Sequence, residues 1–334
     1  MARGMTEPSA IAATSPALSR LAETLGVRPF PLALGGNVFG WTADEAGSFE
    51  VLDAFVAGGG TLLDTADGYS HWVPGHRGGE SEAIIGRWLA GRSDRDELAI
   101  ASKVSTHPEF AGLSAANIRA AADASLTRLG TDRIDLYYAH FDDESVPLEE
   151  TVGALSALVD AGKVRAIAIS NYTPERIDEW FRVTAENGFH RAVALQPHYN
   201  LVEREFEGAL RERAEREGLA VLPYFSLAKG FLAGKYRDAA DVEAPGASVR
   251  AGGAAEYLDA RGQAVLSALD EIAAAHGVEV ATVSLAWLRS QPTVAAPIAS
   301  ARTTAQLPAL LASAELELTP AELAALAEAS APAA

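Results

Sequence analysis

Short apolar runs alternate with longer amphipathic segments along most of the chain. Several runs are almost continuously hydrophobic, which is typical of parallel strands that are covered on both faces. The first seven runs begin 28 to 37 residues apart, which is the length of one strand–helix unit. The eight runs cover residues 30–36, 61–67, 98–104, 134–140, 164–170, 192–198, 220–226 and 294–300.

The segments between these runs have the periodicity of amphipathic helices, and each is followed by a glycine. A glycine directly after a helical pattern is a strong signal for the end of a helix. Eight strand–helix units in succession predict a single (β/α)8 barrel of the TIM type. The six clearest helical segments cover residues 48–57, 81–90, 114–129, 147–161, 174–187 and 204–217.

An open, doubly wound α/β sheet is the alternative fold. That fold usually carries a G-x-G-x-x-G fingerprint directly after its first strand. Residues 35–40 read GGNVFG, in which the glycines have a different spacing. The pattern therefore favours the barrel.

The remaining segments extend this barrel. Residues 236–260 are rich in Ala, Gly and Asp, with weak periodicity, and predict a long loop after strand 7 that acts as a lid or binding loop. A helical stretch over 261–289 precedes the last strand. The sequence Thr-Pro-Ala-Glu at 319–322 is a capping box that begins an extra C-terminal helix. We expect residues 1–26 to be flexible and residues 27–330 to form one domain.

Composition narrows the possible partners. The 334 residues include 27 Lys and Arg but 45 Asp and Glu, and the net charge of −18 disfavours binding to nucleic acids and acidic membranes. The absence of cysteine excludes disulfides, iron–sulfur clusters and thiol nucleophiles. No apolar run approaches the roughly 20 residues of a membrane helix, and no stretch resembles a signal peptide. We expect a cytoplasmic protein.

Polar side chains follow three neighbouring strands. Asp64, Lys103 and His140 stand at the carboxyl ends of strands 2, 3 and 4, where the side chains of a barrel converge. A buried Lys103 beside Asp64 would form an ion pair, and it would lower the pKa of Tyr69 if that side chain lay close. Such a tyrosine could protonate an oxyanion while His140 donates to a carbonyl oxygen. None of these groups supplies a hydride, so a redox cofactor is required.

The motifs in these runs resemble those of the aldo-keto reductases, over about residues 31–326. The resemblance is greatest to longer bacterial members that also resemble the potassium-channel β subunits. It implies transfer of a hydride from NADPH to an aldehyde or ketone, a small-molecule carbonyl substrate. The motifs are DTADGY at 64–69, SKV at 102–104, DLYYAH at 135–140, ISNY at 169–172, LQPHYN at 195–200 and PYFSLAKGFLAGKY at 223–236.

The resemblance assigns a role to each matching position. Tyr69 corresponds to the proton donor, with Asp64 and Lys103 tuning it and His140 orienting the carbonyl. The residues implied for the cofactor are Ser170, Asn171 and Gln196 at the nicotinamide carboxamide, Tyr224 under its ring, Leu227, Gly230 and Lys235 at the pyrophosphate, and Ser300, Arg302 and Gln306 at the adenosine ribose and its 2′-phosphate.

One departure of this sequence from the family's pattern concerns the choice of cofactor. Many members carry a Glu-Asn pair for the adenine in the final segment, and residues 302–310 lack it. The preference for NADPH over NADH therefore rests mainly on Arg302.

Aromatic residues after several strands suggest an apolar substrate pocket. We expect these side chains to wall a space above the nicotinamide, beside a long loop over residues 71–79 whose Arg77 meets either a polar substrate or solvent only. The expected pocket residues are Phe39, Trp41, Trp72, Phe141 and Phe225.

Two other functions stay open. A cofactor-binding regulatory or interaction subunit with little turnover is compatible with the channel-subunit resemblance, although an intact set of four catalytic positions favours an enzyme. A metal-dependent barrel hydrolase would need more histidines near the strand ends than His140 and His198. We expect no metal, and the sequence leaves the oligomeric state open.

Overall fold

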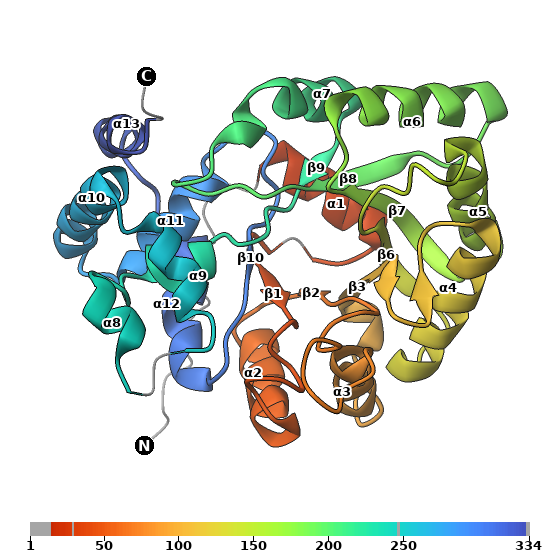
Figure 1. The fold of residues 1–334 in the computed structure, drawn as a ribbon, viewed down its shortest axis with the longest axis horizontal. Helices are drawn as coiled ribbons and strands as arrows, with labels where there is room; N and C mark the ends of the chain where they lie inside the picture. Colours follow the sequence, from red (N-terminus) through yellow and green to blue (C-terminus); the bar gives the residue numbers. More distant parts are fainter. Residues whose placement is uncertain (1–14, 29, 246–247, 332–334) are drawn as a thin grey trace, which may run out of the picture.

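Eight parallel strands form the centre of the computed structural model, which describes residues 15–28, 30–245 and 248–331. Each predicted apolar run contains one strand, and Figure 1 shows them surrounded by helices. They are β1 (Ala33–Gly35), β2 (Leu62–Asp64), β3 (Ala99–Val104), β6 (Ile134–Ala139), β7 (Val164–Ser170), β8 (Ala192–Gln196), β9 (Ala220–Val221) and β10 (Ile298–Ala299).

The sheet closes on itself. Its strand order is β10-β1-β2-β3-β6-β7-β8-β9. The two ends of this order are joined because the amide of Ala295 donates to the carbonyl of Val221 (2.8 Å) and the amide of Ile298 donates to that of Pro223 (2.9 Å). A closed sheet of eight parallel strands confirms the predicted (β/α)8 barrel.

The helices after the first six strands lie where the periodicity predicts them. Ser114 and Thr173 cap the starts of two of them, each accepting a hydrogen bond from a backbone amide three residues later. Gly130, Gly188 and Gly218 end three of them in the left-handed region, as predicted. The six are α2 (Glu45–Ala57), α3 (Glu80–Leu89), α4 (Ala115–Leu129), α5 (Leu148–Asp160), α6 (Pro174–Asn187) and α7 (Ala209–Glu217).

The C-terminal third differs in detail from the prediction. The single helical stretch expected over 261–289 is two helices, because Gly277 adopts φ +65° and ends the first. The long loop contains two short helices. Earlier in the chain, outside this third, a hairpin of β4 (Thr106–His107) and β5 (Phe110–Ala111) follows β3. The helices of the C-terminal third are α8 (Ala239–Glu243), α9 (Ala251–Ala254), α10 (Ala260–His276), α11 (Val280–Arg289), α12 (Leu307–Leu311) and α13 (Pro320–Ala329), the last with its predicted capping box.

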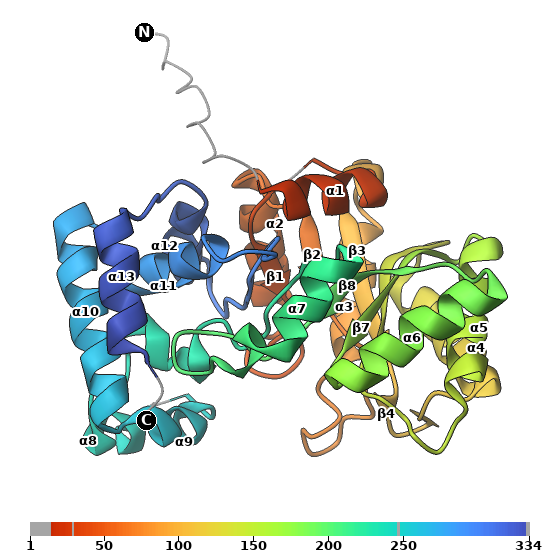
Figure 2. The ribbon, with the colours of Figure 1, turned by 90° about the horizontal axis from the view of Figure 1, so that it is seen from above.

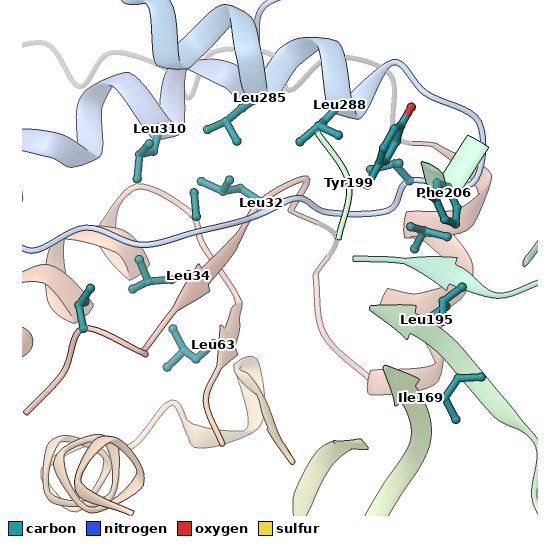
Figure 3. Close-up of a cluster of buried hydrophobic side chains, with 14 of the residues drawn as sticks. Leu32, Leu34, Leu63, Ile169, Leu195, Tyr199, Phe206, Leu285, Leu288 and Leu310 are labelled. Atoms are coloured by element: carbon teal, nitrogen blue, oxygen red, sulfur yellow. The ribbon is translucent and has the colours of Figure 1, made fainter. Parts of the chain in front are cut away.

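Alternate residues of each strand face two different cores. Leu34 and Leu63 point outward and pack in one large cluster with Leu285 and Leu288 of α11 (Figure 3). Leu62 points inward and belongs to a second cluster inside the barrel, in which most side chains are alanines. The next inward position on β2 is Asp64, so this alternation aims its carboxylate along the barrel interior.

A short helix closes the amino-terminal end of the barrel. Helix α1 (Pro16–Leu25) places Leu18, Leu21 and Leu25 in the inner cluster, and each buried leucine contributes about 1.5–3 kcal/mol. Figure 2 shows α1 lying across one end of the strands. The expectation that residues 1–26 are flexible is therefore wrong for 16–25, and its first 14 residues lie outside the described ranges. Within those ranges, no helix has the length and apolar character needed to cross a membrane.

Candidate active site

The carboxyl ends of the strands surround a cavity of about 580 Å³. This volume is in the range of small-molecule sites. The cavity lies at the end of the barrel opposite α1, where the loops that follow the strands meet. Barrel enzymes carry their chemistry at this end.

A buried lysine links two of the candidate catalytic residues. The Nζ atom of Lys103 donates to Asp64 Oδ2 (2.7 Å), to Tyr69 Oη (2.9 Å) and to the carbonyl of Thr65 (2.9 Å). Lys103 is fully buried, which lowers its pKa, but the neighbouring Asp64 and Tyr69 together raise that pKa above its ordinary value. The ammonium is therefore charged and holds the Tyr69 hydroxyl in place.

The proton on Tyr69 is more firmly held than the sequence suggests. Burial raises the pKa of Tyr69 to about 12, although the nearby Lys103 acts in the opposite direction. The expectation of a lowered pKa is wrong because desolvation of the phenolate outweighs the attraction of Lys103, and Asp64 opposes that attraction. Tyr69 therefore carries its proton at physiological pH and is suited to donate it.

His140 is neutral beside this group. It follows β6, and burial, reinforced by the charge on Lys103, lowers its pKa well below the ordinary value. Its Nδ1 lies 3.4 Å from the hydroxyl of Thr106, and its ring centroid lies 6.2 Å from that of Tyr69. When Thr106 donates to Nδ1, the tautomer places the imidazole proton on Nε2, which is then free to donate to a ligand.

A hydrogen-bonded set of polar side chains adjoins these residues. Asn171 adopts a left-handed φ of +59°, and its Nδ2 donates to the carbonyl of His140 (2.9 Å). Tyr224 Oη donates to Asn171 Oδ1, and Gln196 Nε2 donates to Asp64 Oδ1, each at a distance of 2.9 Å. These bonds, with Ser170 Oγ donating to the Gln196 carbonyl (2.8 Å), fix one wall of the cavity relative to the candidate catalytic residues.

Basic side chains collect at another part of the cavity, although the chain as a whole has a net charge of −18. Lys229 forms an ion pair with Glu256 (2.9 Å), whereas Lys235, Arg250 and Arg302 form none among the described residues. Burial and the proximity of Arg302 lower the pKa of Lys235. Unpaired, mutually repelling cations in a cavity favour an anionic ligand such as a phosphate.

All ten residues expected at the cofactor line this one cavity. Their convergence is notable because they come from the ends of four strands and from two later loops. They are Ser170, Asn171, Gln196, Tyr224, Leu227, Gly230, Lys235, Ser300, Arg302 and Gln306.

Four of the five expected aromatic residues also line the cavity. Trp72, Phe141 and Phe225 are 45%, 47% and 37% exposed, and the ring of Trp72 meets that of Trp41 edge to face at 5.5 Å. Phe39 does not contribute to this wall, so the expectation for it is corrected. Its side chain is 1% exposed and packs in the outer core, and its neighbour Val38 faces the cavity instead.

Several cavity residues are absent from the sequence-based set, and Asn37 and Arg250 are two polar examples. Asn37 accepts a hydrogen bond from Ser300 Oγ (2.8 Å). Arg250 lies in the long loop, with its guanidinium 5.0 Å from the centre of the Trp41 ring. Arg250 is the one basic residue between Arg237 and Arg261, and this isolated charge in an acidic loop is a signal that could have identified it.

The chain is similar to known proteins over most of its length. The Aldo/keto reductase family model matches residues 31–331. Protein tas of Escherichia coli (strain K12) is 33% identical over 314 residues, covering 86% of this chain and 90% of that protein. Aldo-keto reductase YhdN of Bacillus subtilis (strain 168) is 34% identical over 292 residues, covering 83% and 81%.

A fungal relative extends the match to nearly the full barrel. Norsolorinic acid reductase stcV of Emericella nidulans is 32% identical over 323 residues, covering 91% of this chain and 79% of that protein. The chain therefore belongs to the aldo/keto reductase family, whose enzymes are NAD(P)H-dependent oxidoreductases.

Proposed function

We propose that this protein reduces an aldehyde or ketone with NADPH, and that Tyr69 donates the proton. The observation that carries the proposal is the contact of Lys103 Nζ with both Asp64 and Tyr69 at the cavity. It combines a protonated phenol with a fixed positive charge beside it. A hydrolase that uses a nucleophile or a metal would have no need of this arrangement.

The cavity residues fit a nicotinamide dinucleotide. When bound, this cofactor supplies the hydride. Ser170, Asn171 and Gln196 would hold its carboxamide, and the Tyr224 ring would lie against the nicotinamide. The remaining residues would contact the phosphates and the adenosine ribose. They are Leu227, Gly230, Lys235, Ser300, Arg302 and Gln306.

Reduction of a carbonyl places negative charge on its oxygen, and the chain supplies two donors for that charge. Neutral His140 would donate an N–H bond to the oxygen and orient it. Tyr69 would transfer its proton as the charge develops, a contribution of about 10²–10⁴-fold. Lys103 would stabilise the phenolate left on Tyr69, since no other cation of the described residues lies within hydrogen-bond distance of that hydroxyl.

Optical assay of NADPH and NADH oxidation with a panel of aldehydes and ketones tests this function. We expect turnover with at least one carbonyl class and the higher kcat/KM with NADPH. Tight binding of NADPH without turnover across the panel would instead favour a regulatory or interaction subunit. Failure to bind either cofactor would contradict the proposal altogether.

The choice between the two cofactors provides a prediction for Arg302. Substituting Arg302→Ala is expected to raise the Kd of NADPH about tenfold and that of NADH less than about twofold, because the guanidinium would pair with the 2′-phosphate. Fluorescence titration with each cofactor measures both constants. Arg87→Ala, which removes an exposed arginine paired with Glu45, is the control for the change in net charge. Equal losses for the two cofactors would exclude a role for Arg302 in selecting NADPH.

The aromatic wall provides a prediction for substrate size. Trp72→Ala is expected to lower kcat/KM about tenfold for a bicyclic aromatic aldehyde, because the exposed indole offers a large apolar contact at the cavity mouth. A two- or three-carbon aldehyde is too short to reach it and serves as the control. Steady-state kinetics on both substrates measure the difference. An unchanged profile would remove Trp72 from the substrate pocket.

A further inference from the structure

A second buried polar group lies behind the turn that carries Tyr69, on the outer side of the sheet. Asp64 points into the barrel, and three residues later Asp67 is fully buried on the outer side. The groups around it come from four different elements. We refer to these residues as the Asp67 cluster, which consists of Asp67, Glu82 of α3, Ser102 of β3, Arg128 of α4 and Tyr137 of β6.

The one cation of this cluster, Arg128, is paired with Glu82. Arg128 Nε donates to Glu82 Oε2 (2.7 Å), and Ser102 Oγ donates to Glu82 Oε1. Arg128 also donates to Ser125 Oγ (3.2 Å). Neither carboxyl oxygen of Asp67 has a well-formed hydrogen bond among the described residues, although the backbone amides of Gly68 and Ser105 lie close to the carboxyl.

An ionised Asp67 would therefore add an uncompensated charge to the interior. It would stand beside the Glu82 carboxylate, and Arg128 is already paired with that group. The hydroxyl of Tyr137, which also has no partner in the described part of the chain, faces the same cluster. A buried carboxylate without a cation is strongly disfavoured, so the geometry requires an uncharged carboxyl.

The titration of the surrounding groups agrees with this geometry. Burial, followed by repulsion from Glu82, raises the pKa of Asp67 to about 8. Attraction to Arg128 and the backbone amides of Gly68 and Ser105 act in the opposite direction with smaller effect. His107 of β4 flanks the cluster, and burial lowers its pKa, so it adds no compensating charge above pH 7.

A tight turn connects Asp67 to Tyr69. The amide of Asp67 donates to the carbonyl of Lys103 (3.1 Å), and the amide of Tyr69 donates to that of Ala66 (3.3 Å). Gly68 packs so closely that an added Cβ would lie 2.4 Å from Thr106 Oγ1. Ser70, at φ +71°, ends the turn with a bond from its Oγ to the carbonyl of Phe39 (3.2 Å). A displacement at Asp67 therefore reaches the Tyr69 hydroxyl through a segment with little freedom.

We propose that Asp67 is a positioning residue whose uncharged carboxyl fixes the turn that presents Tyr69 to Lys103. This inference rests on the proposed function for its effect on turnover, but not for its effect on the turn itself. Ionisation of the carboxyl at alkaline pH makes its buried position unfavourable. The turn then loosens, and Tyr69 loses its alignment with Lys103 and His140.

The pH dependence of kcat separates this role from a purely structural one. None of the groups at the reacting carbonyl titrates near pH 8, because the pKa of Tyr69 is about 12 and that of His140 is well below its ordinary value. For the wild type, kcat is expected to fall about tenfold from about pH 7.5 to about pH 9.5. Asp67→Asn, which keeps the shape without the charge, is expected to retain its pH 7.5 value across this range. Asp132→Asn, which changes an exposed carboxyl before β6 at the other end of the barrel, should behave as wild type.

Stability and backbone exchange provide readouts that do not depend on turnover. Since the raised pKa belongs to the folded state, wild type should lose stability relative to Asp67→Asn as the pH rises from about 4 to about 8. Above about pH 8 the difference in stability between the two proteins should stay constant. Hydrogen exchange of residues 66–70 should be equal in the two proteins at pH 6.5 and faster in wild type at pH 9.5.

The outcomes are distinct. An alkaline fall in kcat that persists in Asp67→Asn would overturn the positioning role, as would equal exchange of residues 66–70 at both pH values. A pH-dependent stability difference without any difference in kcat or exchange would show a structural role only and would also overturn it. Absence of turnover in the wild type at pH 7.5 would contradict the proposed function. The comparison of hydrogen exchange would still test whether Asp67 fixes the turn.

Discussion

Tyr69→Phe is expected to lower kcat by about 10²–10⁴-fold and to leave the Kd of NADPH within about twofold of wild type. The substitution removes only the hydroxyl that Lys103 Nζ contacts at 2.9 Å. The ring and its edge-to-face contact with Trp72 stay in place. In the proposed mechanism the hydroxyl supplies a proton only as charge develops on the substrate oxygen, so its loss should affect the chemical step and not the binding of the cofactor.

The matched control is Tyr172→Phe, which removes the hydroxyl of another buried tyrosine that has no hydrogen-bond partner within the described ranges. It should leave kcat unchanged. Single-turnover measurements with bound NADPH separate the chemical step from product release in both variants. Retention of the wild-type single-turnover rate in Tyr69→Phe would show that another group donates the proton.

Lys103→Met is expected to reduce both activity and stability. Removing the ammonium leaves the Asp64 carboxylate buried without its cation, and breaking a buried ion pair in this way costs about 3–5 kcal/mol. Activity is expected to fall about 10²-fold or more, because the phenolate formed on Tyr69 would lose the positive charge of the Lys103 ammonium. Urea unfolding and steady-state kinetics measure the two effects separately.

A double variant distinguishes these effects. In Asp64→Asn/Lys103→Met neither buried charge is left unpaired, so most of the lost stability should return while the activity stays low. Recovery of activity together with stability would mean that Lys103 serves the fold alone. A Lys103→Met variant as stable as wild type would contradict the buried ion pair itself.

The barrel and the candidate catalytic residues follow from local rules that sequence patterns express directly. Parallel strands covered on both faces are recognisable by their apolar runs, and the glycines that end the helices define where each strand–helix unit stops. Period-two alternation then aims Asp64 and Lys103 into the barrel, since Leu62 and Ala101 on the same strands are interior residues.

Other features depend on packing that the local pattern does not express. Phe39 follows β1 by four residues, and the backbone turn between them, not the alternation, decides that it faces the outer core. Arg250 reaches the cavity from a loop whose sequence has no regular periodicity from which its path could be predicted. Helix α1 is ordered by contacts with the barrel interior, whereas its composition alone resembles a flexible segment.

The electrostatics of the site also required the three-dimensional surroundings. The sequence places Lys103 near Tyr69 but cannot weigh that attraction against the burial of the phenol, which reverses the direction of the pKa shift. Asp67 resembles a turn former beside Gly68 in the sequence. Its burial next to Glu82 is visible only once α3 and α4 are packed against the sheet.

The most direct test of the central claim is to follow the hydride itself. The wild-type protein would be incubated with a carbonyl substrate and NADPH deuterated at both C4 positions, and the alcohol analysed by mass spectrometry. We predict that the alcohol carries a single deuterium at the carbinol carbon, in a yield equal to the NADPH oxidised, and that Tyr69→Phe forms little of it. Cofactor oxidation without deuterated alcohol, or tight binding of NADPH with no alcohol from any carbonyl in the panel, would contradict the assignment as a carbonyl reductase.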